Sequence, residues 1–303
     1  MVGASVGADL KWAGQASSLR MSTARNMVSL LEPLIIAGVL VLVVGWLAGE
    51  PFVVAYRRAR LRRRPFPDAW REFLRRRVPY FRMLPADLQL QLKRHIQVFL
   101  AEKPFIGCAG LEVTDEMRVT IAAQACLLLL NRRRPDYFPN LHQILVYPGA
   151  FIVDRVQPDA AGVLQERRHV LSGESWSLGQ VVLSWDDVVE GAEVVDDGRN
   201  VVIHEFAHQL DQQNGPANGA PRLFGRARRR RWASVLGAEF ERLQDAARDG
   251  LPGLLSYYGA TNPAEFFAVA SEVFFERAPR MAIEHPELYR ELSRFYRVNP
   301  LSW

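Results

Sequence analysis

Residues 200–211 read NVVIHEFAHQLD, and this stretch decides which fold the chain can form. Two histidines, His204 and His208, stand four positions apart, and Glu205 follows the first of them. Residues four apart share one face of a helix, so both imidazole rings can point at a single ion. Zn²⁺ suits imidazole nitrogen, and a catalytic zinc site keeps one position open for water. Glu205 lies too far round the helix to be a natural ligand, so we expect it to accept a proton from that water.

The same stretch predicts a helix with two different faces. Its apolar residues recur at the i, i+3, i+4 and i+7 spacing of a stripe that faces a protein core: Ile203, Phe206, Ala207 and Leu210. The histidines lie together on another side with Asp211, and Asn200 is an acceptable N-cap. A chance match to H-E-x-x-H in a chain of this length has a probability on the order of 1%. The amphipathic setting therefore favours a metal-binding helix.

A tetrahedral site needs a third protein ligand, and residues 257–279 (YYGATNPAEFFAVASEVFFERAP) supply the candidates. Asn262 is typical of a helix N-cap, and Glu265 then takes the third helical position, where a glutamate can also complete a capping box. Glu272 lies seven residues further on, at roughly the same side of that helix. These residues alone favour neither carboxylate. Tyr258 precedes the helix, and its hydroxyl could stabilise an oxyanion that develops during catalysis.

Charge is unevenly distributed along the 303 residues. The net charge of +5 arises from 38 Lys and Arg against 33 Asp and Glu, but residues 51–103 alone carry 14 basic and 4 acidic groups. The chain beyond residue 103 is therefore acidic. A nucleic-acid enzyme is more naturally basic around its working groups, so we expect no direct nucleic-acid binding. The two cysteines, Cys108 and Cys126, exclude a disulfide scaffold and a thiolate metal site.

An apolar segment near the start of the chain predicts a membrane anchor. Residues 33–49 are 17 consecutive uncharged residues, close to the lower limit for crossing the hydrocarbon core. The basic stretch RRARLRRR follows at residues 57–64, which favours a cytoplasmic body and contact with anionic lipid. The sequence therefore predicts a weakly structured tail over residues 1–26, a transmembrane helix over 27–50, a basic juxtamembrane linker over 51–64 and one domain over 65–303.

The hydrophobic pattern of that domain predicts an α+β fold that is mostly helical, with a small sheet in its middle. Short β-branched runs at residues 141–153 and 180–184 predict strands, and residues 141–147 or 180–184 are candidates for pairing with an extended substrate. Apolar positions at helical spacing predict helices that open near residue 70, cover about 85–102 and 117–131, and return after residue 200.

HEFAHQLD followed by YGATNPAEFFAVASEVFF resembles the Mlc titration factor A family of zinc-dependent peptidases, whose zinc core is similar to the catalytic domain of anthrax lethal factor. The resemblance runs from about residue 66 to the carboxyl end and includes FPDAW, FLAEKPFIG, IAAQACLLLL, VLSGESW and VVLSWDDV. It implies a zincin-like metallopeptidase domain. It also implies that Glu265 completes a zinc site with His204 and His208.

The same resemblance gives expectations for three further side chains. Tyr258 falls where the toxin domain has a tyrosine that reaches the metal site. Asp211 ends the family pattern H-E-F-A-H-x-L-D, which implies a supporting or helix-end role. With Glu265 as the ligand, Glu272 is expected to support the ligands from outside the metal shell.

The expected function is a zinc peptidase in which Glu205 is the general base and the substrate is a peptide or protein. The alternative is a regulatory protein that sequesters a transcriptional repressor of sugar uptake, as the family name records, with zinc structural or vestigial. Well-known family members are soluble cytosolic proteins, so a soluble cytoplasmic protein is the alternative to anchoring at the inner membrane. The basic run RARRRR at residues 226–231 predicts a solvated face or a rim that selects acidic substrate residues.

Overall fold

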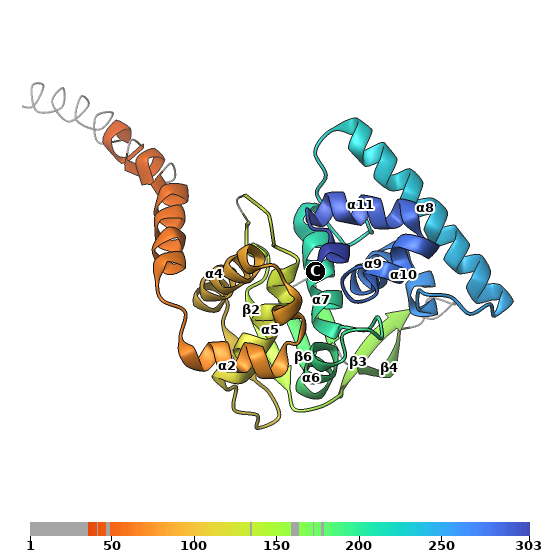
Figure 1. Ribbon diagram of the computed structural model, residues 1–303. Helices are drawn as coiled ribbons and strands as arrows, with labels where there is room; N and C mark the ends of the chain where they lie inside the picture. Colours follow the sequence, from red (N-terminus) through yellow and green to blue (C-terminus); the bar gives the residue numbers. More distant parts are fainter. Residues whose placement is uncertain are drawn as a thin grey trace, which may run out of the picture. The chain divides into compact units, whose positions relative to one another are not determined.

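The computed structural model describes residues 36–40, 42–46, 49–133, 135–158, 164–171, 173–176 and 179–303, with backbone alone over 151–176 (Figure 1). The chain divides into two compact units, Met1–Arg60 and Leu61–Trp303. The predicted tail over residues 1–26 lies outside the described residues. The described part of Ile36–Arg63 forms a helix that is long and apolar enough to cross a membrane, and the basic residues 57–63 belong to it.

The second unit is the expected mostly helical α+β fold. Its sheet has the order β1-β2-β6-β5, in which β1, β2 and β6 are parallel and β5 is antiparallel. The predicted strand at residues 180–184 is confirmed, whereas residues 141–153 divide between β2 and β3, and β3 pairs with β4 as a separate antiparallel hairpin. The strands are β1 (Phe105–Gly107), β2 (Gln143–Tyr147), β3 (Phe151–Pro158), β4 (Leu164–Leu171), β5 (Gly173–Trp176) and β6 (Gln180–Ser184).

The expectation that residues 141–147 or 180–184 offer a free strand edge is wrong. β2 lies between β1 and β6, and β6 lies between β2 and β5, so both strands have a partner on each side. Their apolar runs are typical of strands in a parallel sheet, and this pattern does not distinguish an interior strand from an edge strand. Among the described strands of this sheet, β5 is the edge that lies next to the histidine-bearing helix α7.

Helices surround the sheet and account for most of the described residues (Figure 1). After the apolar helix Ile36–Arg63, the helices described before β6 are α2 (Asp68–Arg77), α3 (Tyr80–Met83), α4 (Ala86–Glu102) and α5 (Asp115–Leu127). Those that follow it are α6 (Trp185–Glu193), α7 (Val201–Asp211), α8 (Arg226–Asp249), α9 (Pro263–Glu276), α10 (Ala278–Glu284) and α11 (Pro286–Tyr296). A 3-10 turn, η2 (Tyr257–Ala260), leads into α9.

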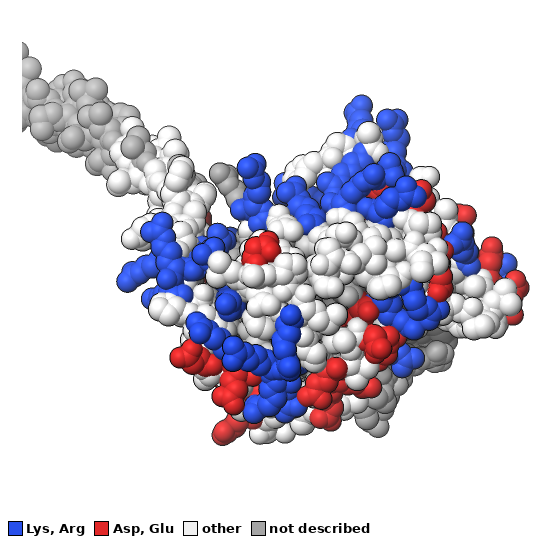
Figure 2. Space-filling model, in the orientation of Figure 1, with Lys and Arg blue, Asp and Glu red and all other residues white. Residues whose placement is uncertain are grey.

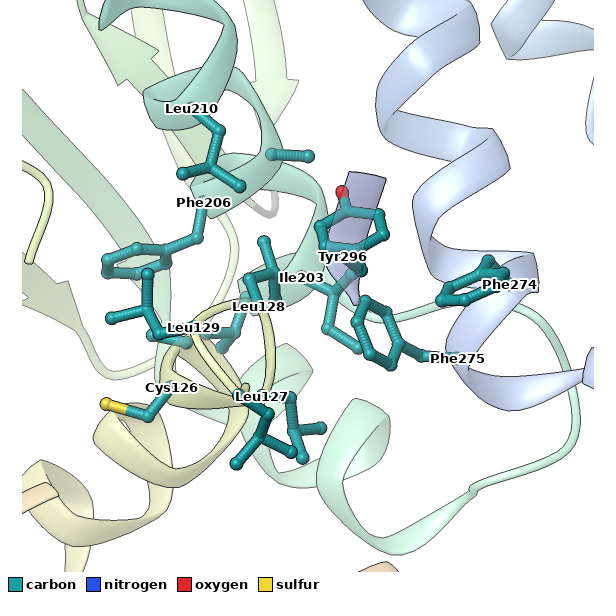
Figure 3. Packing of buried hydrophobic residues seen from close by; sticks show 14 of the residues in the cluster. Cys126, Leu127, Leu128, Leu129, Ile203, Phe206, Leu210, Phe274, Phe275 and Tyr296 are labelled. Carbon is teal, nitrogen blue, oxygen red and sulfur yellow. The ribbon is translucent and has the colours of Figure 1, made fainter. Parts of the chain in front are cut away.

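The apolar face of α7 is packed into the centre of the core. Figure 3 shows Ile203, Phe206 and Leu210 turned toward the apolar residues that follow α5, with Phe275 and Tyr296 close by. The predicted stripe on α7 is confirmed, because Ile203, Phe206, Ala207 and Leu210 are each at most 1% exposed. Burial of one such large side chain stabilises the fold by about 1.5–3 kcal/mol. This packing fixes the rotation of α7 and turns its histidines away from the core.

Candidate metal centre

Two N-capped helices bring the centre together. The side-chain oxygen of Asn200 accepts the backbone N–H of Ile203 at 2.9 Å and starts α7, as predicted. Asn262 caps α9 in the same way by accepting the N–H groups of Ala264 and Glu265 at 2.9 and 3.0 Å. Because this cap is complete without a reciprocal side chain, the Glu265 carboxylate is available for contacts outside its own helix.

The Glu265 carboxylate meets both histidines of α7. Its Oε2 lies 3.0 Å from Nε2 of His204 and 3.4 Å from Nε2 of His208. One ligand atom from each of the three side chains lies within 4.8 Å of the others. Ligands at about 2.0–2.1 Å from a tetrahedral ion are about 3.3 Å apart, so these spacings fit one metal ion. Two imidazole nitrogens and one carboxylate oxygen are also a donor set that suits zinc.

Opposite charges stabilise the ionised forms at this centre. Burial alone would raise the pKa of Glu265, but hydrogen bonds from His204 and His208 outweigh it and hold that pKa far below its usual range. Burial lowers the pKa of His204, whereas the carboxylates of Glu272 and Glu265 raise it well above its ordinary value. The negative potential that favours a charged imidazole here also favours a bound cation.

Glu272 lies on the other side of the His204 ring. Its Oε1 is 2.7 Å from Nδ1 of His204, and its Oε2 accepts the backbone N–H of Asn200 at 2.6 Å. In the neutral ring that a bound metal requires, a carboxylate that accepts from Nδ1–H leaves Nε2 unprotonated and pointed at the ligand position. Glu272 and Glu265, which the spacing could not distinguish, therefore contact opposite nitrogens of the same imidazole ring.

A cleft of about 390 Å³ opens beside the centre and is lined by His204, Glu205, Tyr258 and Glu272, among others. Glu205 is 4% exposed and lies on this side of α7. Tyr258, at 55% exposed, belongs to η2, and its ring centroid lies 5.9 Å from that of His204. The residues expected to carry base and oxyanion chemistry therefore share one cleft with a metal-facing histidine.

Asp211 is the last residue of α7 and binds the loop that follows the helix. Its buried carboxylate accepts the backbone N–H groups of Asn218 and Gly219 at 2.8 and 2.6 Å, and burial raises the pKa of Asp211 above its usual value. Gly219 has a φ of +76°, and a Cβ there would stand 2.3 Å from the carbonyl oxygen of Pro263. Asp211 therefore holds the loop after α7 against the first residue of α9, which fits the helix-end role.

A half-buried carboxylate beyond this network was not singled out from the sequence. Glu276 lies one helical turn after Glu272, and its Oε2 accepts the backbone N–H of Gly198 at 3.1 Å. Burial, with Asp197 and Glu272 nearby, raises the pKa of Glu276 from 4.5 to about 9. The available signal was an acidic residue four positions from another on an otherwise apolar helix.

The arrangement is that of an HExxH-type metallopeptidase centre. It has two histidines on one helix, a carboxylate from a second helix and a glutamate in the adjoining cleft. The family model for the glucose-regulated metallo-peptidase M90 matches residues 53–297. The chain belongs to this family.

Relatives from several bacteria share much of the chain. An uncharacterized protein of Synechocystis sp. is 39% identical over 273 residues, which cover 90% of this chain and 99% of that protein. Mlc titration factor A of Klebsiella pneumoniae subsp. pneumoniae is 35% identical over 230 residues, or 74% of this chain and 84% of that protein. The protein of the same name from Cronobacter sakazakii is 34% identical over 229 residues, with the same coverage. The match with the Synechocystis protein covers all but a small part of this chain. The uncovered residues are fewer than the residues that precede Ile36, so the match extends into the apolar helix.

Proposed function

We propose that the protein is a zinc-dependent peptidase that hydrolyses peptide bonds with Glu205 as general base. The observation that carries this proposal is the convergence of His204, His208 and Glu265, with their ligand atoms within 4.8 Å of one another, beside an open cleft. Three protein ligands leave a fourth tetrahedral position for water or substrate, whereas a structural zinc site is normally closed by four protein ligands.

When bound, zinc supplies Lewis-acid chemistry, which polarises a scissile carbonyl and lowers the pKa of water towards about 7. Glu205 accepts the proton of the attacking water and passes it to the leaving amine. Burial of Glu205 in the wall of the cleft strengthens its electrostatic effect on a reacting group. Tyr258, at the mouth of the cleft, donates its hydroxyl to the oxyanion of the tetrahedral intermediate. Glu272 keeps the His204 ring in its ligating orientation.

An extended substrate is proposed to pair with β5. This strand is the described edge of the sheet next to α7, and because it pairs with β6 on one side, its other row of backbone groups faces away from the described strands of that sheet. Backbone hydrogen bonds to an edge strand provide affinity before any side-chain selection. β5 replaces the two interior strands that the sequence suggested.

Replacement of Glu205 by Gln tests the function. The variant is expected to keep its zinc and lose peptide hydrolysis by about 10²–10⁴-fold in kcat, because an amide cannot accept the proton. Glu190→Gln is a matched control, since Glu190 lines the same cleft and is exposed. Hydrolysis of a peptide library by Glu205→Gln at the parent rate would contradict the proposed base.

A second function, regulation by binding a transcriptional repressor, is favoured by relatives named Mlc titration factor A. Removal of zinc separates the two functions. A binding module retains its partner after chelation, whereas a peptidase stops hydrolysing its substrate. The measurement is repressor capture and peptide cleavage in parallel, before and after chelation.

We also propose that the protein is anchored to the inner membrane with its catalytic domain in the cytoplasm. Support comes from the apolar helix Ile36–Arg63 and from the basic residues at its end. Arginines next to a hydrophobic span favour a topology in which the segment that carries them stays in the cytoplasm, where they contact anionic lipid headgroups.

A further inference from the structure

A second hollow lies beside residues 263–266 and contains none of the metal-facing residues. It has a volume of about 660 Å³ and is formed by the loop over residues 214–224, by one face of α8 and by the start of α9. Its buried floor is apolar, with Leu223, Trp232, Leu236 and Phe266. We call this hollow the α8 groove.

The rim of the α8 groove is aromatic and cationic. Phe224 is 71% exposed, and the guanidinium carbon of Arg222 lies 5.0 Å from the centre of its ring. The charged side chains that line the groove are Arg222 and Arg229, and none of its lining residues is acidic. Arg226 and Arg230 are exposed on the same first two turns of α8.

These arginines differ from their neighbour in having no acidic partner. Arg231 is paired with Glu287 and Glu291, whereas Arg222, Arg226, Arg229 and Arg230 form no ion pair with the described residues. Figure 2 shows basic side chains gathered over the part of the surface where Figure 1 places α8 and α11. The groove therefore combines an apolar floor with uncompensated positive charge.

The α8 groove is connected to the candidate centre through the chain itself. Pro263, in its wall, stands two residues before Glu265, and the carbonyl oxygen of Gly219 accepts the indole N–H of Trp232 at 2.9 Å. The Gly219 N–H is held by Asp211, three residues after His208. A peptide seated in the groove would thus contact the start of α9, the helix that carries Glu265.

We infer that the α8 groove is a docking site for an acidic and hydrophobic segment of the protein substrate, outside the cleft in which hydrolysis takes place. One large apolar side chain of that segment enters the groove, and flanking Asp or Glu side chains contact Arg222, Arg226, Arg229 and Arg230. Apolar burial supplies the affinity and charge complementarity selects the segment. The inference rests on the proposed peptidase function in one respect: that function makes the bound segment part of a substrate.

Gly237 allows the groove to be filled without removing any contact. It lines the groove in the middle of α8, and a Cβ built on it meets nothing within 4 Å. Gly237→Leu occupies the groove and also replaces glycine by a stronger helix former. Ala238→Leu is the matched control, because Ala238 is exposed and does not line the groove.

Binding is measured by fluorescence anisotropy on the full chain in detergent, in the Glu205→Gln background so that the probe survives. The probe is a fluorescein-labelled, C-terminally amidated peptide Gly-Glu-Asp-Phe-Leu-Asp-Glu-Gly. We expect Gly237→Leu to weaken its binding by at least about tenfold and Ala238→Leu to change it by less than about twofold. A peptide with Gln and Asn in place of Glu and Asp should bind at least about tenfold more weakly, and salt should weaken only the acidic probe.

Equal affinity in Gly237→Leu and the control, or equal affinity for the acidic and neutral peptides, overturns the inference. If the peptide binds only when its C-terminal carboxylate is free, the occupant is a chain terminus and the inference is overturned. If the sole effect of Gly237→Leu is a change in oligomeric state, the occupant is a second copy of the chain, and the inference is overturned as well. If the zinc-loaded parent cleaves no peptide but the binding pattern holds, the peptidase function fails and the docking site stands. If the parent cleaves a short neutral reporter peptide, Gly237→Leu in the active protein should raise the KM for the acidic peptide and leave the KM for the neutral reporter unchanged.

Discussion

Glu272 links the metal-facing ring of His204 to Asn200, the N-cap residue of the helix that carries that ring. One oxygen lies 2.7 Å from Nδ1 of His204, and the other accepts the Asn200 N–H at 2.6 Å. The ring orientation and the start of α7 are thereby set by one side chain from α9. A shift of α9 would move the His204 ring together with Glu265, so the geometry of the centre depends on the packing of these two helices.

Glu272→Gln is expected to weaken zinc affinity by about 10–100-fold, the usual effect of losing the partner of a ligating histidine. The amide offers one oxygen to two donors and places its own N–H₂ against either His204 or Asn200. A competitive titration with a chromophoric chelator measures the affinity. An unchanged zinc affinity would show that Glu272 is not a positioning residue.

Glu276 predicts a specific dependence of stability on pH. Its pKa is about 9 in the folded protein and 4.5 in its ordinary state, so the folded state binds more protons between these values. The free energy of unfolding should therefore fall as pH rises from 4.5 towards 9. Glu276→Gln mimics the protonated form and should be more stable than the parent by about 1 kcal/mol or more at pH above neutrality. Chemical unfolding at several pH values is the measurement, and parallel curves for the two proteins would contradict it.

Asp211→Asn is expected to destabilise the protein by about 1–3 kcal/mol, because the Asn218 and Gly219 N–H groups lose a buried anionic acceptor. Hydrogen exchange should become faster at those two amides, and urea unfolding gives the free energy. Asp249→Asn, at the exposed end of α8, serves as the control. If both variants exchange and unfold like the parent, Asp211 does not hold the loop.

Membrane anchoring makes a prediction about the apolar helix. Introducing Leu42→Lys and Val43→Lys together places two charges in its apolar part, at a cost of about 2.5–3.5 kcal/mol each near the centre of a bilayer. The parent should remain with membranes after carbonate extraction, and the double variant should move to the soluble fraction. Leu90→Lys, on an exposed position of α4, should not change the distribution. A parent protein found in the soluble fraction would contradict the anchor.

Local patterns were enough to predict the helix at the centre of the site. The caps at Asn200 and Asn262 and the apolar stripe of α7 depend on residues within one or two turns, and all were confirmed. The metal-facing set could be named because the histidines share one helix and the family resemblance selected Glu265. These features need no knowledge of how distant segments pack.

Other features depended on tertiary packing and could not be read from spacing. Glu265 and Glu272 share a helical side, and only the approach of α9 to α7 decides which nitrogen of His204 each one meets. β1 has three residues, too few for a periodic signal, yet it pairs with the edge of β2 that was predicted to be free for a substrate. The α8 groove is formed by three separated segments, so its residues share no local pattern.

The zinc content of the purified full chain tests the central claim most directly. Measured by inductively coupled plasma mass spectrometry, the parent and Glu205→Gln should each hold about one zinc per chain, since a single tetrahedral site is expected. Glu265→Ala should hold far less while its far-ultraviolet circular dichroism spectrum stays unchanged. Equal zinc in Glu265→Ala and the parent, or loss of zinc in Glu272→Ala with zinc retained in Glu265→Ala, would contradict the convergence of His204, His208 and Glu265 on one ion.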